Sequence, residues 1–405
     1  MTDGCAKPGL LPVEAALERL LGLADATRVN ATEEVALAAA DGRVLAQALV
    51  AGLDLPPWDN SAMDGYALRL AEAGGEPLAV SQRIFAGTAP APLQAGTCAR
   101  IFTGAPIPQG ADCVEMQENA ELLADGRVRF LQPLQARQHI RAQGQETRRG
   151  ETVLAAGTRL TPVELGLIAS LGVSRVKVFA GLRVAVLSTG DELVEPGKVL
   201  APGQIYNSNR PLLIGWLERL GCRVLDAGIL PDNLPATRAA LAGLQDAELI
   251  LSTGGVSVGE ADFLGDALRE AGELALWKLA IKPGKPLTFG HFRGVPVLGL
   301  PGNPASTLVT FGLLARPYIL RRMGVQAVTP LAFNVPAGFS WNKPGSRREY
   351  LRAQLQEGRA VLYPNQSSGV LRSAAWADGL VEVREHSTLA EGEEVRFIPF
   401  SELLG

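Results

Sequence analysis

Between residues 180 and 320 the sequence alternates short apolar runs with amphipathic runs, and this alternation constrains the fold more than any other feature. The apolar runs RVAVLS, AELILS and VPVLGL are typical of buried strands, and the runs RPLLIGWLERLG, PATRAALAGL and FLGDALREAG are typical of helices. Apolar strands that alternate with helices form a parallel sheet covered by helices on both faces. We therefore predict an α/β multidomain protein with a doubly wound, mostly parallel α/β domain over residues 180–329.

The segments outside this domain have different patterns. An amphipathic helix is predicted over residues 11–23, and a second helix is predicted from Thr161, with Gly172 as its stop. Between residues 54 and 142, glycine and proline punctuate short β-rich pieces such as LAVSQRIF and GRVRFLQP, which indicates an inserted β-rich domain. The last 75 residues or so lose the helical pattern, and this indicates a short β domain over residues 330–405.

Composition excludes several function classes. The formal net charge is −4, which argues against a protein that binds nucleic acid by bulk charge. No apolar run reaches the roughly 18 residues of a membrane span, and the N-terminus does not resemble a signal peptide, so we expect a cytoplasmic protein with no membrane partner. The four cysteines form no CxxC pair, and the three histidines lack the spacing of metal ligands. Acid–base and metal chemistry therefore falls mainly to Asp, Glu and Lys.

The tetrapeptide LSTG occurs twice, at residues 187–190 and 251–254, each time at the end of an apolar run. Ligands of open parallel sheets bind at the carboxyl ends of strands, so the repeat predicts two strand ends that border one crevice. Gly190, Gly254 and Gly255 allow sharp turns, and the amides of such turns bind anions. Two ordinary strand-to-helix turns without a ligand are the alternative.

Acidic residues follow three of the predicted strand ends. Asp191 and Glu192 follow the first LSTG, Glu260 and Asp262 follow the second, and Asp232 follows the strand that ends before Pro-Asp-Asn. Carboxylates beside amide donors suit Mg²⁺ that is bridged to phosphate oxygens. Acidic residues in the first turn of a helix also simply stabilise the helix dipole, and this is the alternative for each of them taken singly.

The segment Gly255–Gly259 also matches GxSxG, the nucleophile elbow of α/β-hydrolases, with Ser257 as its serine. Ser257 comes well past the predicted strand end, and no HGGG-type loop accompanies it. A five-letter motif alone is weak, and a serine hydrolase would leave the acidic turns without a role. We therefore do not favour this reading.

Cations and hydroxyls gather in three other segments. IKPGKP holds two lysines around a stiff Pro-Gly turn, GSRREYLRAQ concentrates arginines, and NQSSGVLRSAA offers hydroxyls beside glycine. Lysine and arginine side chains bind oxyanions, and arginine does so with a planar fork. A solvated basic loop and a charged strand face are the alternatives.

Taken together, six segments resemble the MoeA family, which includes bacterial molybdopterin molybdenumtransferase and the similar E domains of gephyrin and plant Cnx proteins. In chain order they are PPWDNSAMDGYA, IFTGAPIPQGAD, LSTGDEL, LSTGGVSVGEADF, IKPGKP and GLPGNPAS. The resemblance implies a segmented helical domain of residues 8–53 plus 143–179, an inserted β-rich domain of residues 54–142, a doubly wound molybdopterin-binding domain of residues 180–329 and a C-terminal β-barrel of residues 330–405.

The resemblance also implies the activity. Members of the family insert molybdate into adenylated molybdopterin in a Mg²⁺-dependent reaction that releases AMP and gives the molybdenum cofactor. They are homodimers with the active site at the subunit interface. Molybdate is a substrate in this scheme, and Mg²⁺ is the cofactor.

The family's functional residues match the following positions of this chain. The catalytic residues are Asp59, Thr103, Glu192, Asp232 and Asp262, of which Glu192, Asp232 and Asp262 would hold the metal. Asp59 would reach the crevice of the partner subunit. The molybdate-binding residues are Lys282, Lys285, Ser306, Arg347 and Ser368. Beside them, Gly190, Gly254, Gly255 and Ser257 would bind the pterin substrate.

Two other functions remain open from the sequence. A molybdopterin adenylyltransferase is one alternative, because that family shares the doubly wound domain, and such an enzyme is also a candidate partner of this chain. A molybdopterin-binding scaffold without catalysis is the other alternative, because the E domain of gephyrin is also a scaffold.

Overall fold

The protein, described here from a computed structural model, is resolved over residues 9–255, 263–271 and 274–404, and it divides into two compact units. We call Met1–Ala46, Gly157–Thr161 and Val176–Gly405 the large unit, and Gln47–Ala156 and Pro162–Arg175 the small unit. In the described ranges no helix has both the length and the apolar character that crossing a membrane requires. The finer division into four domains stays a prediction.

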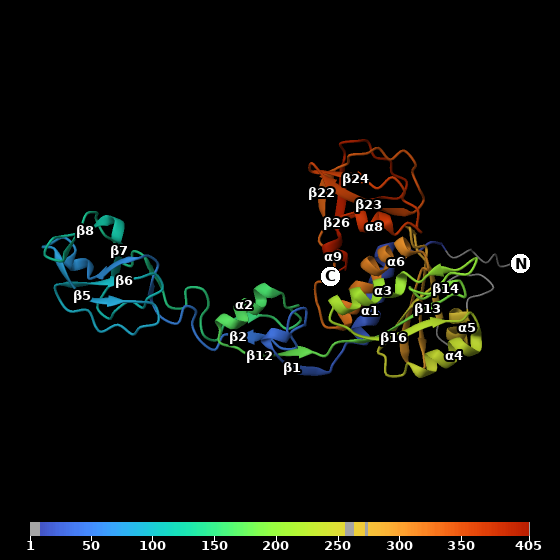
Figure 1. The fold of residues 1–405 in the computed structure, drawn as a ribbon, viewed down its shortest axis with the longest axis horizontal. Coiled ribbons are helices and arrows are strands. Elements are labelled where there is room, and N and C mark those ends of the chain that lie inside the picture. The colour runs from blue at the N-terminus through green and yellow to red at the C-terminus, as the bar shows by residue number, and fades with distance from the viewer. Residues whose placement is uncertain (1–8, 256–262, 272–273, 405) are drawn as a thin grey trace, which may run out of the picture. The chain divides into compact units, whose positions relative to one another are not determined.

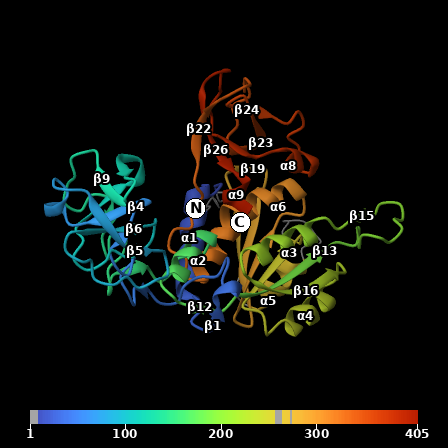
Figure 2. The ribbon, with the colours of Figure 1, turned by 60° about the vertical axis from the view of Figure 1, so that its left-hand side comes forward.

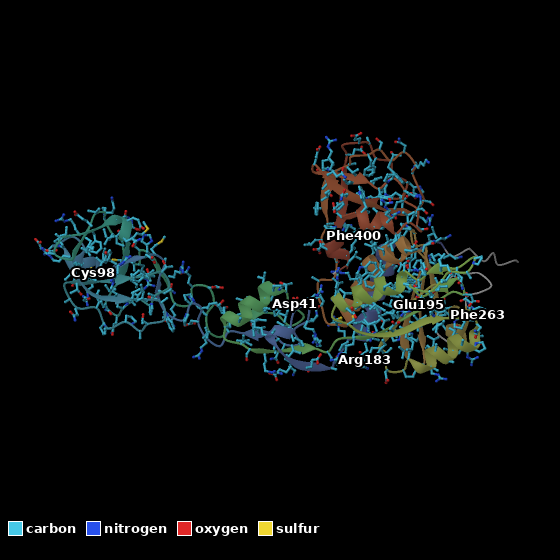
Figure 3. The ribbon with its side chains drawn as sticks, in the orientation of Figure 1. Asp41, Cys98, Arg183, Glu195, Phe263 and Phe400 are labelled. Atoms are coloured by element: carbon cyan, nitrogen blue, oxygen red, sulfur yellow. The ribbon has the colours of Figure 1, made fainter. Side chains whose placement is uncertain are left out.

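The small unit is built on one six-stranded sheet in the order β7-β4-β6-β5-β9-β8 (Figure 1). Its strands are β4 (Gly65–Leu68), β5 (Leu78–Ile84), β6 (Thr97–Ile101), β7 (Cys113–Met116), β8 (Ala120–Leu122) and β9 (Arg127–Phe130). Ala67 and Ile101 belong to one apolar cluster on this sheet, and Leu68 and Cys98 belong to another. Cys98 is labelled in Figure 3. The predicted β-rich character of this segment is confirmed.

Shorter elements complete the small unit. These are β2 (Leu49–Val50), β3 (Asn60–Ser61), η2 (Leu70–Glu72), η3 (Gln117–Asn119), β10 (Ile140–Arg141), β11 (Thr152–Leu154) and α2 (Pro162–Ser170). β10 pairs with β3 and β11 pairs with β2, both antiparallel. The helix predicted from Thr161 is therefore present as α2, and Gly172 follows it with φ +74°, a left-handed conformation that favours glycine.

The large unit contains the predicted sheet, in the order β16-β13-β17-β21-β20-β18. Its strands are β13 (Arg183–Thr189), β16 (Arg223–Leu230), β17 (Leu249–Thr253), β18 (Leu274–Lys278), β20 (Pro286–Phe292) and β21 (Val295–Leu300). The first four strands of this order are parallel to their neighbours, as predicted. The last two pair antiparallel, and the sequence pattern did not indicate them.

Helices cover both faces of this sheet, which confirms the doubly wound arrangement. They are α3 (Asn209–Arg219) and α6 (Pro304–Thr310) on one face, and α4 (Leu234–Gly243) and α5 (Phe263–Glu270) on the other (Figure 1). The side chains of β13 alternate between the two cores: Val184 and Val186 pack toward α3, and Ala185 and Leu187 pack toward α4 and α5. This alternation is the period-2 pattern of a strand that is buried on both faces.

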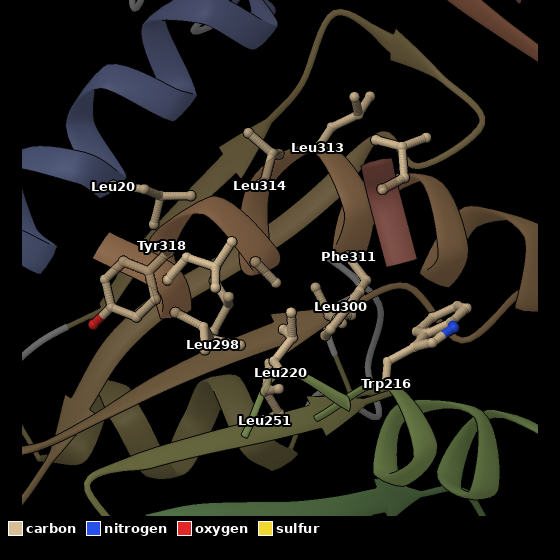
Figure 4. Packing of buried hydrophobic residues seen from close by; sticks show 14 of the residues in the cluster. Leu20, Trp216, Leu220, Leu251, Leu298, Leu300, Phe311, Leu313, Leu314 and Tyr318 are labelled. Atoms are coloured by element: carbon tan, nitrogen blue, oxygen red, sulfur yellow. The ribbon is translucent and has the colours of Figure 1, made fainter. Parts of the chain in front are cut away.

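The N-terminal helix α1 (Val13–Ala26) packs in the core of the large unit. Its buried face includes Leu20, which lies in one cluster with Leu314 and Tyr318 (Figure 4). The same cluster holds a stacked pair, Trp216 of α3 and Phe311, whose ring centroids are 4.9 Å apart. Phe311 opens a π-helical turn (Phe311–Ala315) that leads from α6 into α7 (Arg316–Arg322).

The C-terminal residues form a second sheet of the large unit, in the order β19-β23-β25-β26-β22, with β24 paired to β23 (Figure 2). Its strands are β19 (Ile281–Lys282), β22 (Phe333–Pro336), β23 (Arg348–Gln356), β24 (Arg359–Leu362), β25 (Gly379–Val383) and β26 (Glu394–Pro399). A bridge between Ala337 and Ala360 links the chain after β22 to β24. Closure of this sheet into a barrel stays a prediction.

The remaining elements of the large unit are short. They are β1 (Thr32–Ala36), η1 (Leu37–Ala39), β12 (Arg175–Phe179), β14 (Leu193–Val194), β15 (Ile205–Tyr206), α8 (Arg372–Trp376) and α9 (Phe400–Leu404). β14 and β15 pair in parallel at the two ends of a long loop that follows β13. Cys98, Cys113 and Cys222 are buried free thiols, and Cys5 lies outside the described residues.

The Leu20→Ala substitution should destabilise the large unit. The Leu20 side chain of α1 is fully buried against the α7 region. Truncation of this side chain removes apolar contacts and leaves a cavity. We expect the free energy of unfolding to fall by about 2–5 kcal/mol, measured by denaturant-induced unfolding. Glu18→Ala, on the exposed side of the same helix, is the control and should change it by less than about 0.5 kcal/mol. Equal effects of the two substitutions would contradict the packing of α1.

Candidate functional site

The carboxyl ends of β13, β16, β17 and β21 lie along one edge of the parallel sheet, and the loops that follow them form the candidate site. Gly254 follows β17 with φ +84°, and a Cβ atom at this position would lie 2.6 Å from the carbonyl oxygen of Thr189. Gly190 follows β13, and a Cβ atom there would lie 2.5 Å from the Glu192 carboxylate. Both turns therefore require glycine, as predicted from the two LSTG segments.

A cavity of about 620 Å³, here called the basic cavity, opens beside these turns. Its walls come from the turn after β17, the β19 turn, the start of α6 and the loop after β24. Four cationic side chains line it, and no Asp or Glu is among its described lining residues. The residues that line it include Gly254, Gly255, Lys278, Lys282, Lys285, Gly302, Asn303, Ser306, Arg347, Gln366, Ser367 and Ser368.

This cavity brings together the residues that the sequence proposed for an oxyanion. They are Lys282, Lys285, Ser306, Arg347 and Ser368, which come from segments far apart in the chain. The lysines are exposed and Ser306 is buried. Cations at the surface of the cavity with hydroxyls at its wall form a pocket suited to a tetrahedral dianion.

Strand pairing fixes the position of Lys282. β19 pairs in parallel with β23, so that Lys282 lies opposite Glu349. The Lys282 ammonium is 3.1 Å from the Glu349 carboxylate, whose side chain is only 6% exposed. Arg347 Nη1 donates a hydrogen bond to the Ile281 carbonyl oxygen at 3.2 Å, which ties the same two segments together. The C-terminal sheet thus positions a lysine that is separated in sequence from its other strands by β20, β21, α6 and α7.

The start of α6 positions the hydroxyls. Asn303 occupies the capping position and Pro304 the first helical position, but the Asn303 side chain makes no capping hydrogen bond. It lines the cavity instead. The Ala305 amide donates to the carbonyl oxygen of Ser368 at 2.9 Å, so the loop that carries Ser368 is held against the helix that carries Ser306.

A second cavity of about 310 Å³, here called the polar cavity, adjoins the first. The two cavities share Gly254, Gly302 and Asn303. The polar cavity is lined further by Thr189, Glu192, Leu193, Ile205, Tyr206, Asn207, Ser208, Asn209, Thr253 and Pro304. A ligand that passes Gly254 therefore has access to both.

Acidic residues gather at the edge of the polar cavity. The Asp232 amide donates to Asp191 Oδ1 at 3.0 Å, and the Asp191 amide lies 3.4 Å from Asp232 Oδ2, so the loops after β13 and β16 are joined. The pKa of Asp232 is raised, first by burial and then by the negative charges of Asp191 and Glu192. Carboxylates that lie close together repel one another, and a bound divalent cation would relieve this repulsion.

The predicted metal set is present in part. Glu192 and Asp232 come from neighbouring strand ends, and Asp262 and Ser257 lie outside the described residues. Within the described ranges, no group of three His, Cys, Asp or Glu side chains is placed to hold a metal ion. Magnesium needs only one or two protein carboxylates and retains water ligands, and a magnesium site at Glu192 and Asp232 stays a prediction.

Asp59 and Thr103 belong to the small unit, where both are tied to neighbours. Asp59 accepts hydrogen bonds from Arg137 Nη1 at 2.5 Å and from the Gln143 amide at 2.8 Å, and the Arg137 bond is the main cause of its lowered pKa. The amide and hydroxyl of Thr103 both donate to Asp64 Oδ1 at 2.8 Å. The role of Asp59 at a partner subunit's crevice stays a prediction.

Sequence reasoning missed several residues of the site. Lys278 and Gln366 line the basic cavity, Glu349 holds Lys282, and Asn207 and Asn209 line the polar cavity. The pattern Asn-Ser-Asn just before a helix was a usable signal for the last two, because buried asparagines need specific partners. No local signal pointed to Glu349, whose role depends on strand pairing.

Three family models match the chain in order. They are described as the MoeA N-terminal region (domain I and II) over residues 11–172, "Probable molybdopterin binding domain" over residues 185–321, and the MoeA C-terminal region (domain IV) over residues 334–400. The matches leave only short segments between them, so the similarity covers nearly the whole chain.

Relatives and solved structures agree with these matches. A molybdopterin molybdenumtransferase of Haemophilus influenzae is 41% identical over 92% of this chain and 95% of its own length. One from Synechococcus elongatus is 39% identical over 95% of this chain and 96% of its own length. The crystal structure of a molybdopterin biosynthesis MoeA protein from Pyrococcus horikoshii OT3 superposes with a TM-score of 0.82, at 28% identity, covering 96% of this chain and all of that one.

The Lys285→Ala substitution should weaken oxyanion binding in the basic cavity. Removal of one of its cations deletes a charge-assisted contact, so we expect the affinity for inorganic sulfate, measured by isothermal titration calorimetry, to fall about tenfold. Lys343→Ala removes an exposed lysine that does not line the cavity and is the matched control. Equal sulfate affinity of both variants and the parent protein would rule out Lys285 as an anion ligand.

The Arg137→Ala substitution should destabilise the small unit in a pH-dependent manner. The pKa of Asp59 is lowered in the folded state, so its pair with Arg137 stabilises the fold above pH 3.8, the ordinary pKa, and this stabilisation is lost as the pH falls through the lowered value. The variant should melt at a lower temperature than the parent at pH 7, and the gap should close below about pH 3.8.

The matched control for this experiment is Arg129→Ala. Arg129 pairs with Glu121, and both side chains are about half exposed, so its loss should leave the melting temperature nearly unchanged. A gap between the Arg137→Ala variant and the parent that is independent of pH would show that Arg137 stabilises the fold by packing rather than through Asp59.

Proposed function

Because the chain belongs to the MoeA family of molybdopterin molybdenumtransferases, we propose that it inserts molybdenum from molybdate into molybdopterin in molybdenum cofactor biosynthesis. The substrate in this proposal is adenylated molybdopterin, which is hydrolysed to release AMP as the metal is transferred. The single observation that carries the proposal is the pair of adjoining cavities, one lined by four cations and the other lined by Glu192.

Molybdate is a tetrahedral dianion, and the basic cavity supplies the groups that recognise one. Lys282 and Lys285 supply positive charge, Ser306 and Ser368 supply hydroxyl donors, and Arg347 supplies a planar fork. The carboxylate of Glu349 holds Lys282 at the mouth of this cavity and so limits its motion. Fixing molybdate beside the dithiolene sulfurs makes the transfer effectively unimolecular, and such positioning lowers a barrier by several kcal/mol.

The acidic side of the site would bind the cofactor Mg²⁺ through Glu192 and Asp232, with Asp262 as a further candidate ligand. A bound Mg²⁺ would neutralise the charge of the phosphates and polarise the phosphorus so that water can attack it. The turn glycines Gly190, Gly254 and Gly255 allow the pyrophosphate to approach the backbone amides, and Ser257 is a proposed hydroxyl contact. These groups hold the anhydride while its bond to AMP breaks.

The proposal extends to assembly. A homodimer with an interfacial active site would bring Asp59 and Thr103 of one chain to the crevice of the other. Arg137 lowers the pKa of Asp59 below its ordinary value, and the ionised carboxylate can act as an acceptor or as a cation contact there. A molybdopterin adenylyltransferase, the enzyme that makes the adenylated substrate, is the proposed partner.

The experiment that tests the proposal mixes the purified protein with adenylated molybdopterin, molybdate and Mg²⁺ and measures AMP release. Release should depend on molybdate and Mg²⁺, and Asp232→Asn should lower the rate roughly a hundredfold, since a metal contact contributes several kcal/mol. Asp246→Asn, on an exposed loop away from both cavities, is the control and should keep the parent rate.

The same assay separates the alternatives. Transfer of AMP from ATP to molybdopterin would identify an adenylyltransferase. Tight binding of molybdopterin without AMP release would identify a scaffold. An unchanged rate for Asp232→Asn would remove this residue from the metal site.

A further inference from the structure

Arg352 of β23 is a fully buried cation to which the proposed reaction gives no role. Its relative exposure is 0%, and among the described residues it forms no ion pair with an Asp or Glu side chain. Its Nη1 atom also has no hydrogen-bond partner there. Burial lowers the pKa of Arg352 to about 10, so the side chain keeps its charge at neutral pH. A buried charge without an acid is costly, so stability alone does not explain an arginine at this position.

Both side-chain hydrogen bonds of Arg352 tie β23 to the part of the chain that follows β24. Nε donates to Ser373 Oγ of α8, and Nη2 donates to the carbonyl oxygen of Ser367, each at 3.0 Å. The Arg352 amide donates to Gln366 Oε1, and Gln366 Nε2 donates to the Arg352 carbonyl oxygen, each at 2.9 Å. One residue of β23 thus fixes the loop that joins β24 to α8, and the three elements lie together in the C-terminal part of the large unit (Figure 2).

The same loop forms part of the wall of the basic cavity, which Gln366, Ser367 and Ser368 line. Gln366 and Ser367 also line a cavity of about 300 Å³ that Arg352 borders, so the guanidinium lies behind this wall. On its other flank the loop is held by the Ala305 amide, which donates to the carbonyl oxygen of Ser368 at 2.9 Å. The position of Ser368 therefore depends on β23 on one side and on the start of α6 on the other.

We propose that Arg352 is a positioning residue for oxyanion binding, whose guanidinium fork holds residues 366–368 so that the Ser368 hydroxyl is placed for the anion in the basic cavity. Arg352 acts through this segment and does not touch the anion. A planar fork bonds two acceptors in a fixed geometry, which a lysine ammonium does not do. The inference rests on the proposed function for the identity of the anion, molybdate.

Arg352→Met and Arg352→Lys test the proposal by isothermal titration calorimetry with inorganic sulfate, which is a tetrahedral dianion like molybdate. Methionine fills much of the same space without fork or charge, and lysine keeps the charge without the fork. Because the fork is lost in both, each variant should bind sulfate about tenfold more weakly than the parent. Sulfate affinity of Arg352→Lys equal to that of the parent would show that charge alone matters, and it would overturn the proposal.

Arg316→Met is the matched control. Arg316 of α7 is also buried, burial also lowers its pKa to about 10, and it lines neither the basic cavity nor the cavity behind it. This variant should bind sulfate as the parent does, whatever its melting temperature. A tenfold loss of sulfate affinity in Arg316→Met would show that removal of any buried cation weakens binding, and it would contradict a specific role of Arg352.

Ser373→Ala is the milder test, and it decides the question if Arg352→Met does not fold. It removes the hydroxyl that accepts from Arg352 Nε, while Ser373 itself lines neither cavity. The fork keeps its bond to Ser367, so sulfate binding should weaken by only about threefold. Unchanged affinity in this variant and in Arg352→Lys would overturn the proposal.

A double-mutant cycle separates positioning from a general loss of structure. If Arg352 acts through Ser368, the tenfold loss caused by Arg352→Met should be mostly absent in a Ser368→Ala background, because the hydroxyl to be positioned is already gone. Combined with Lys285→Ala, whose ammonium comes from a different segment of the cavity wall, the two losses should multiply. Losses that multiply in both combinations would overturn the proposal.

Failure of this inference is distinguishable from failure of the proposed function, because sulfate binding involves no turnover. In the AMP-release assay, Arg352→Met should raise the molybdate concentration at half-maximal rate about tenfold and leave the maximal rate near that of the parent. Losses that multiply in both cycles, together with intact molybdate-dependent AMP release, would overturn the positioning role and leave the proposed function standing. Absence of sulfate binding by the parent protein would also overturn the inference.

Discussion

The parallel register of β13, β16, β17 and β21 is the constraint on which the site depends. Parallel strands that start in register also end together, so the turns after them meet at one edge of the sheet. The Asp191–Asp232 contact and the close approach of Gly254 to Thr189 are direct results of this register. A strand shifted by one residue would turn Ser188 and Thr189 around and separate the glycines from the acids.

A second pairing places the cations. The two residues of β19 leave the doubly wound sheet and join the C-terminal sheet beside β23, and this pairing brings Lys282 to the buried carboxylate of Glu349. The basic cavity consequently has walls from both sheets, although the acids at the polar cavity come from one sheet alone. The cations of the basic cavity and Glu192 of the polar cavity are thus held by different segments, and among the described residues Gly254, Gly302 and Asn303 line both cavities.

Much of this arrangement could be predicted from sequence. The parallel strands β13, β16, β17 and β21 and the helices between them follow from periodicity, and the five oxyanion residues, suggested by resemblance, do share one cavity. The antiparallel strands β18 and β20 were not predicted, because apolar composition does not reveal antiparallel strands that continue a parallel sheet. Glu349 was missed because its role depends on Lys282, which is distant in sequence. Asn207 and Asn209 were missed because the cavity that they line is formed by segments distant in sequence.

The docking of α1 in the large unit has a consequence for how the chain folds as it is made. α1 packs against α7, which is synthesised near the end of translation, whereas the sheet of the small unit is complete within one continuous stretch of sequence. Contacts between segments so far apart close a long loop and form late. The apolar face of α1 therefore stays without its native cover until α7 has been synthesised, and a chaperone that binds exposed apolar surface would protect the helix in that interval.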